Sequence, residues 1–214
     1  MTRTRIKFCG LTRVEDVAAA ARLGVDYVGL VLAASSPRAV SVDQAVELAH
    51  AVRSGPGQGP AIVLLFRDAD AERVDAAVQR IRPDLLQFHG HEEPASCEAF
   101  GLPYWKAVGM AGGTPWSDDV HRRAAALLLD AHEPGGAGGT GHRFDWTQWP
   151  RSSRTLVLAG GLTPDNVARA VRIARPYAVD VSSGIEAAPG VKDPDRMSAF
   201  AAAVRAADGD APAG

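Results

Sequence analysis

The sequence predicts an α/β protein, a single-domain (β/α)8 TIM barrel, on the strength of three observations. Its 214 residues suit one such barrel, with little chain left over for a second module. Short apolar runs recur eight times, separated by amphipathic, alanine-rich stretches. The runs are hydrophobic almost throughout, which is typical of parallel strands buried on both faces. Eight such repeats favour closure into a barrel over an open sheet.

The expected elements follow from this pattern. The strands span Ile6–Cys9, Tyr27–Leu32, Ile62–Phe66, Leu85–Phe88, Tyr104–Val108, Leu127–Asp130, Leu156–Ala159 and Ala178–Val181. Amphipathic periodicity predicts helices over Val14–Leu23, Asp43–Arg53, Ala71–Ile81 and Pro164–Ala174. After the fourth, fifth and sixth strands we expect helices partly from the repeat itself. The barrel domain should occupy residues 1–205, and the small and polar residues 206–214 should form a disordered tail.

Composition and charge exclude several classes of function. The formal net charge is -2 with both signs interspersed, so no basic stripe is available for a nucleic-acid backbone. No apolar run is long enough to cross a bilayer, and the N-terminus reaches Gly10 before a signal-peptide core could form. We therefore expect a cytoplasmic protein. There the two cysteines should stay reduced, and their spacing is not that of a metal site.

Two side chains at strand ends could carry acid and base chemistry. Cys9 ends the first expected strand and Asp130 the sixth, and in this fold the chemistry lies at the carboxyl ends of strands. A thiolate is both a base and a nucleophile, and an apolar setting favours a protonated carboxyl that can act as an acid. The alternatives are an inert packed cysteine, as we expect for Cys97, and a carboxylate that caps loop amides. Asp180, inside the eighth strand, is the reserve candidate for the acid.

Glycine and serine pairs follow the last two strands. Gly160 and Gly161 come after the seventh strand, and Ser183 and Gly184 after the eighth. TIM barrels commonly bind phosphate there, so we expect a phosphorylated ligand, although either motif alone also occurs in ordinary turns. The loop after Asp130 contains glycines at 135, 136, 138, 139 and 141 and is expected to act as a lid over the ligand rather than as a simple connector.

Three further polar residues follow strands on the same face. Arg38, after the second strand, is suited to bidentate binding of a carboxylate, although a solvated loop arginine is an equal alternative from position alone. His89 and His91 could be metal ligands, but no third ligand is placed near them by the sequence. We expect neither a metal nor a cofactor, because no cofactor motif is present.

Six sequence blocks, in order from residue 5 to about residue 200, resemble phosphoribosylanthranilate isomerase of tryptophan biosynthesis. They are KFCGLTR, SPRAVSVDQA, DLLQFHGHE, LLLDAHEPGGAGGTGHRFDW, LAGGLTPDN and VDVSSGIEAAPGVKD. The resemblance implies an Amadori rearrangement of N-(5'-phosphoribosyl)anthranilate by acid and base catalysis. It implies that Cys9 is the base, Asp130 the acid, and Arg38 the residue that faces the substrate carboxylate. The implied phosphate-binding amides lie around Gly141, Gly160, Gly161, Ser183 and Gly184.

The sequence departs from the family pattern at a few positions. Arg67 and Asp68 follow the third strand where the family has a small or amide-bearing residue. His142 and Arg143 follow GGTG where Lys or Gln is common, and LQFHG replaces LQLHG. These departures affect loop details rather than the acid and the base.

Two other functions remain open. One is a related phosphate-binding barrel, such as a sugar-phosphate epimerase or the double-substrate isomerase of histidine and tryptophan synthesis. The latter would have aspartates after the first and fifth strands, where this chain has Cys9 and Val108–Gly109. The other is a non-catalytic barrel that binds a phosphorylated ligand. We expect a small phosphorylated partner, no nucleic acid or membrane, and a monomer or homodimer.

Overall fold

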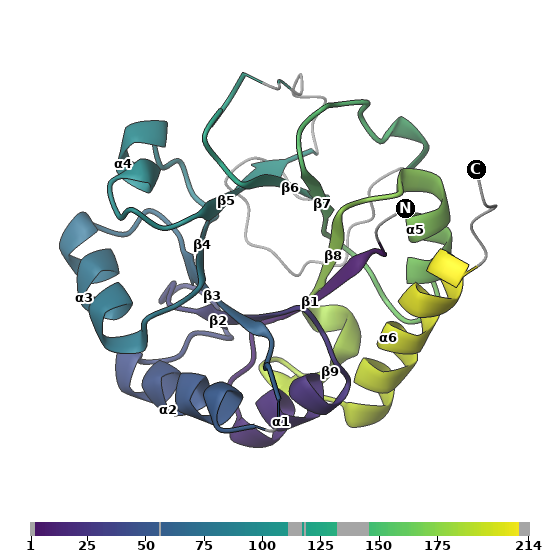
Figure 1. The fold of residues 1–214 in the computed structure, drawn as a ribbon, viewed down its shortest axis with the longest axis horizontal. Helices are drawn as coiled ribbons and strands as arrows, with labels where there is room; N and C mark the ends of the chain where they lie inside the picture. The colour runs from purple at the N-terminus through teal and green to yellow at the C-terminus, as the bar shows by residue number, and fades with distance from the viewer. Residues whose placement is uncertain (1–2, 56, 111–116, 118, 132–145, 210–214) are drawn as a thin grey trace.

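Eight parallel strands close into a barrel in the computed structural model, which describes residues 3–55, 57–110, 117, 119–131 and 146–209. Each strand pairs with the next along the chain, and β8 returns to β1, so the ring in Figure 1 has no open edge. The strands are β1 Arg5–Cys9, β2 Tyr27–Val31, β3 Ala61–Phe66, β4 Leu85–Phe88, β5 Tyr104–Gly109, β6 Ala126–Asp130, β7 Leu156–Leu158 and β8 Ala178–Val181. The predicted (β/α)8 barrel is confirmed.

Helices lie outside the barrel beside β1–β4 and β8 (Figure 1). They are α1 Val14–Arg22, α2 Val42–Arg53, α3 Ala71–Ile81, α4 Pro94–Glu98, α5 Val167–Ala174 and α6 Pro194–Gly209. The Ser41 side chain stabilises the start of α2 by accepting a hydrogen bond from the backbone amide of Gln44. Asp70 stabilises the start of α3 in the same way, by accepting from the backbone amide of Arg73. Among the described residues, no helix is both long and apolar enough to span a membrane.

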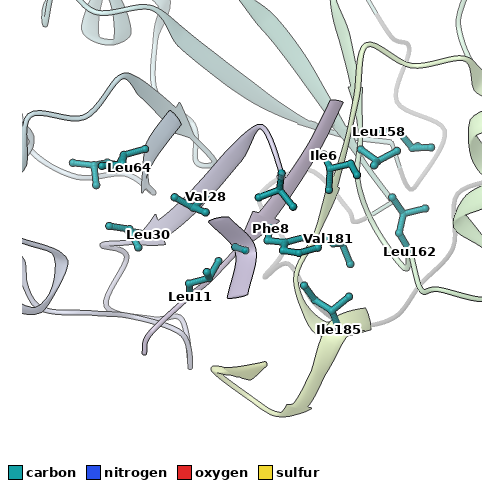
Figure 2. Close-up of a cluster of buried hydrophobic side chains, with 14 of the residues drawn as sticks. Ile6, Phe8, Leu11, Val28, Leu30, Leu64, Leu158, Leu162, Val181 and Ile185 are labelled. Atoms are coloured by element: carbon teal, nitrogen blue, oxygen red, sulfur yellow. The ribbon is translucent and has the colours of Figure 1, made fainter. Parts of the chain in front are cut away.

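The core has two layers because successive strand residues point to opposite faces. Side chains on the outer face of the strands, among them Phe8, Val28 and Leu64, belong to one large buried cluster (Figure 2). Inside the barrel, Val63, Leu85, Trp105, Leu128 and Val157 form a second cluster. Burial on both faces explains why the strands are hydrophobic without alternation.

Several predicted boundaries need correction. Between β5 and β6 the described residues form a turn and no helix, and between β6 and β7 they include only the 3-10 turn Trp146–Gln148. Helix α5 begins at Val167, three residues after the predicted start. Residues 206–209, predicted as part of a disordered tail, belong to α6. There the Asp208 carboxylate accepts hydrogen bonds from the backbone amide and the hydroxyl of Thr4.

A small hairpin follows β8 and adds to the repeat beside the site. Its antiparallel strands are β9 Glu186–Ala188 and β10 Val191–Lys192. The Arg13 side chain donates to the carbonyl of Lys192, and the Asp16 carboxylate accepts from its amide. These two bonds tie the hairpin to the start of α1.

Candidate active site

One pocket lies at the carboxyl ends of the strands and brings together nearly all of the predicted site residues. It is lined by Cys9, Arg38, Asp130, Gly160, Gly161, Ser183 and Gly184, among others. These residues come from the ends of five strands and the loops that follow, so only barrel closure makes them neighbours. Gly141, the glycine-rich stretch before it, and His142 and Arg143 lie outside the described residues.

Cys9 sits at the base of the pocket beside a buried ion pair. The Lys7 ammonium, two residues earlier on the same face of β1, donates to the Asp180 carboxylate at 2.8 Å. A Cβ atom at Gly29 would lie 2.8 Å from the Cys9 sulfur and 3.1 Å from the Lys7 nitrogen, so the two groups border the same small space. Glycine at position 29 therefore leaves room for the thiol, and Asp180, the reserve acid, is already paired.

Burial and charge act in opposite directions on this thiol. Burial raises the pKa of Cys9 above its ordinary value, while the Lys7 ammonium beside it acts to lower the pKa. Burial would lower the pKa of Lys7 as well, but the Asp180 carboxylate and the Cys9 thiolate together outweigh it and the pKa is raised, so Lys7 stays charged. The thiolate of Cys9 would therefore form next to a fixed positive charge.

Asp130 reaches the pocket from β6, across the barrel from Cys9. Its side chain is nearly buried, and its Oδ2 lies 3.7 Å from Nε2 of His89. A Cβ atom at Gly160 would lie 2.8 Å from Oδ1 of Asp130. The β7 loop thus passes close to the carboxyl group, and only a residue without a side chain fits there.

Arg38 is held by a buried carboxylate rather than by solvent. Its Nε and Nη2 groups donate to the two oxygens of Glu186 at 2.8 and 2.7 Å, and the Lys192 ammonium donates to the same carboxylate at 2.7 Å. Burial would raise the pKa of Glu186, but these two cations outweigh it and hold the pKa below its ordinary value. The cluster of Arg38, Glu186 and Lys192 carries two positive charges and one negative charge.

This arrangement corrects one detail of the prediction. The side-on edge of the Arg38 guanidinium, formed by Nε and Nη2, already binds Glu186 and cannot take a second carboxylate in the same way. The end-on edge, formed by Nη1 and the second N–H of Nη2, does not bind Glu186. A ligand carboxylate in the pocket would therefore meet the end of the guanidinium.

The loops after β7 and β8 meet closely. Gly160 and Gly161 have φ angles of 88° and 63°, in the left-handed region that favours glycine. Within the described part of the chain, neither amide donates a hydrogen bond. A Cβ atom at Gly184 would lie 1.8 Å from the carbonyl oxygen of Leu162, so this contact also requires glycine. The backbone here can approach an anion without side chains in the way.

Several residues that contact the pocket lining from behind were missed by the sequence interpretation. Lys7 was a charged residue inside an otherwise apolar strand, which was a usable signal for a buried ion pair. Glu186 and Lys192 lie in the block VDVSSGIEAAPGVKD, but nothing in their spacing indicated contact with Arg38. His91 is 74% exposed, and the described residues contain no group of three His, Cys, Asp or Glu side chains that could hold a metal ion.

Comparison with known proteins identifies the family. Residues 6–203 match the family model for N-(5'phosphoribosyl)anthranilate (PRA) isomerase. The chain belongs to this family. The N-(5'-phosphoribosyl)anthranilate isomerase of Nitrosococcus oceani is 48% identical to it over 201 residues, which cover 92% of this chain and 96% of the relative.

Solved structures of phosphoribosylanthranilate isomerases have the same fold. The enzyme from Thermus thermophilus superposes with a TM-score of 0.80 at 35% identity, covering 95% of this chain and 99% of that one. Another isomerase, solved with reduced 1-(o-carboxyphenylamino)-1-deoxyribulose 5-phosphate, has a TM-score of 0.75 at 30% identity, again covering 95% of this chain and 99% of that one. The chain thus matches members of the phosphoribosylanthranilate isomerase family over nearly its whole length.

Proposed function

We propose that this phosphoribosylanthranilate isomerase family member converts N-(5'-phosphoribosyl)anthranilate to 1-(2-carboxyphenylamino)-1-deoxyribulose 5-phosphate in tryptophan biosynthesis. The observation that carries the proposal is one pocket that holds a thiol, a carboxyl group and a guanidinium, from Cys9, Asp130 and Arg38. The reaction needs one base, one acid and a site for a carboxylate. Residues 1–205, with α6 continuing to Gly209, would form the single catalytic domain.

The mechanism assigns one proton transfer to each of two groups. Asp130 protonates the ring oxygen of the furanose, the bond from this oxygen to C1 breaks, and the nitrogen lone pair forms the Schiff base. The Cys9 thiolate then removes the proton from C2, and the C–H electrons form the C1=C2 bond of an enolamine. The enol hydroxyl loses its proton while C1 gains one, which produces the ketone.

The remaining pocket residues would bind and orient the substrate. The end-on edge of Arg38 faces the carboxylate of the anthranilate ring, with its position set by Glu186. Backbone amides around Gly160, Gly161, Ser183 and Gly184, together with Gly141, would hold the phosphate. Phosphate binding supplies interaction energy far from the reacting carbons, where it can orient them without taking part in the chemistry.

The partners and location follow from the same proposal. Proton transfer and ring opening at a sugar carbon can proceed with amino-acid side chains alone, so we propose no metal or redox cofactor. The expected ligand is a small phosphorylated molecule, with no nucleic acid. We expect a cytoplasmic monomer or homodimer.

The direct test is an activity assay on the purified protein. Freshly generated phosphoribosylanthranilate loses its anthranilate-type fluorescence when it is isomerised, and added protein should accelerate this loss without metal or nucleotide. Binding of the reduced product analogue without any turnover would contradict the proposed activity and favour a non-catalytic barrel.

The Glu186→Gln variant should bind substrate more weakly. The amide cannot accept two charge-assisted hydrogen bonds from Arg38, so the guanidinium loses its fixed direction. We expect KM to rise roughly tenfold, because losing one charge-assisted hydrogen bond weakens binding by about that factor. The change in kcat should be smaller. Steady-state kinetics would measure both constants.

A substrate analogue and a control variant complete this test. The N-(5'-phosphoribosyl)aniline analogue lacks the carboxylate, so its KM should be unaffected by the substitution. Glu72→Gln, on the exposed face of α3, should leave both constants unchanged. Equal effects of Glu186→Gln on both substrates would show that Glu186 does not act through Arg38.

The Gly184→Ala variant should damage both stability and phosphate binding. Its Cβ would meet the Leu162 carbonyl, so the β7 and β8 loops must separate. We expect a loss of about 1–3 kcal/mol in the free energy of unfolding, as for other overpacked sites. Inorganic phosphate should protect the wild type from thermal unfolding and protect the variant less. Gly209→Ala, which has open space around it, is the control, and unchanged phosphate protection in Gly184→Ala would contradict the assignment.

A further inference from the structure

Two pocket residues, Gln87 in β4 and His89 directly after it, have no role in the mechanism above. The two side chains lie on the same face of the chain and both line the pocket. Gln87 is only 1% exposed. Its side-chain oxygen Oε1 is buried and has no hydrogen-bond partner among the described residues.

A buried acceptor without a partner is costly. Leaving such a group unpaired destabilises a protein by about 1–3 kcal/mol, so a partner is expected in the functional state. The residues paired with Gln87 on the neighbouring strands are Leu65 on β3 and Trp105 on β5, and neither donates a hydrogen bond to this oxygen. A donor on a ligand in the pocket, which Gln87 lines, would supply the missing partner.

The other end of the amide points to His89. Nε2 of Gln87 lies 3.5 Å from Nδ1 of His89, and Nε2 of His89 lies 3.7 Å from Oδ2 of Asp130. With the amide in this orientation its N–H donates and Nδ1 accepts, which places the imidazole proton on Nε2. The three side chains form a row in which each N–H points toward the next group and the last is the proposed acid.

The imidazole is held neutral. Burial lowers the pKa of His89, and the nearby cations Lys106 and Lys7 act in the same direction. The carboxylates Asp130 and Asp180 act to raise the pKa but do not outweigh burial. A neutral N–H group can donate to the Asp130 carboxylate without placing a full positive charge beside it.

We propose that Gln87 binds the substrate through Oε1, which accepts a hydrogen bond from the secondary amine or a sugar hydroxyl, and that His89 is a positioning residue whose Nε2–H supports Asp130. The contact from His89 matters when Asp130 gives its proton to the ring oxygen and becomes a carboxylate. The distance of 3.7 Å is longer than a hydrogen bond, and substrate binding would close it. The inference rests on the proposed function for the identity of the substrate.

The test of Gln87 uses binding of paired analogues. The reduced product analogue carries a secondary amine, and a matched ether replaces this N–H by oxygen. A third compound keeps the amine but lacks the C2 hydroxyl. Oε1 of Gln87 should accept a hydrogen bond from either the amine or the C2 hydroxyl. Calorimetry on the wild type should show that the analogue without this group binds roughly tenfold more weakly than the reduced product analogue.

A variant and its control decide this part. Gln87→Met keeps the length of the side chain but cannot accept a hydrogen bond. The variant should therefore bind the reduced product analogue and the compound that lacks the donor equally well. Leu65→Met changes the same pocket wall without altering a hydrogen bond and should keep the wild-type preference. A Gln87→Met protein that still prefers the same analogue, or a wild type with no preference, would overturn the substrate contact.

The test of His89 uses NMR and graded substitutions. In 15N-histidine-labelled protein, the two-bond 1H–15N correlations of His89, assigned by their loss in His89→Gln, should show the neutral tautomer with its proton on Nε2. Proton on Nδ1, or an imidazolium at neutral pH, would overturn the proposal. His89→Leu should lower kcat roughly tenfold with little change in KM, and His89→Gln, which keeps an N–H donor, should recover much of the loss.

The outcomes separate this inference from the proposed function. If the wild type shows no isomerase activity, the proposed function fails whatever the tautomer is. If the wild type is active and His89→Leu turns over at the wild-type rate, the isomerase assignment stands and the role of His89 fails.

Discussion

Replacing Cys9 by alanine is expected to lower kcat by about 10²- to 10⁴-fold, the usual contribution of a positioned general base. The methyl group cannot take the proton from C2, while Arg38 and the β7 and β8 loops remain to bind the substrate. Ring opening by Asp130 should still occur. The Schiff base should therefore accumulate and be trapped by cyanoborohydride as a secondary amine, which mass spectrometry can detect.

The pH dependence of the wild type should carry the signature of the same thiol. Burial raises the pKa of Cys9, so at neutral pH most of the free protein holds the protonated thiol. Each increase in pH above neutral then raises the thiolate fraction, so the removal of the C2 proton, followed as single-turnover consumption of the Schiff base, should accelerate until the pH passes the pKa of Cys9. A rate of this step that falls as pH rises above neutral would contradict this role.

Cys97→Ala is the matched control. Cys97 is also a fully buried free cysteine, but it lies in α4 outside the pocket. The substitution should leave kcat unchanged even if it lowers stability. Wild-type turnover in Cys9→Ala, or equal losses in both variants, would remove Cys9 from the mechanism.

The Asp130→Asn variant should block an earlier step than Cys9→Ala does. The amide has nearly the shape of the carboxyl group but cannot protonate the furanose oxygen. We expect kcat to fall by about 10²- to 10⁴-fold with little change in affinity for the reduced product analogue. Because the ring stays closed, cyanoborohydride should trap no more Schiff base than in a reaction without protein.

The order of the two steps gives a second check on Asp130. A double variant of Cys9→Ala with Asp130→Asn should behave like Asp130→Asn alone in the trapping assay, because ring opening comes first. Asp165→Asn, an exposed substitution beside α5, is the control and should be fully active. If Asp130→Asn traps Schiff base while Asp180→Asn does not, the acid is Asp180.

Much of the architecture could be predicted because it depends on local patterns. Continuous apolar runs and helical periodicity arise from neighbours in the chain, and they indicated eight strands within one or two residues of their observed bounds. The position of Cys9, Arg38 and Asp130 at strand ends then followed from the fold. Where periodicity was weak, the helix expected after β4 is present as α4, and between β5 and β7 the described residues contain no α-helix.

The partners of these residues could not be predicted, because they come from distant parts of the chain. Arg38 meets Glu186 from the hairpin after β8, and Lys7 meets Asp180 across the junction of β1 and β8. Each contact depends on strand register and barrel closure, which no local pattern encodes. His89 shows the same effect, since spacing made it a possible metal ligand while the tertiary structure places it between Gln87 and Asp130.

The sequence by itself determined the barrel and the strand ends at which the pocket residues lie, since hydrophobic burial acts on a period that can be read along the chain. Only the tertiary structure decided which charged groups contact one another. Groups from distant strands set the direction of Arg38 and place an ammonium beside Cys9. They also leave the Gln87 oxygen without a partner among the described residues. Electrostatics and hydrogen bonding act over a few ångströms of space, and that proximity arises from closure of the ring.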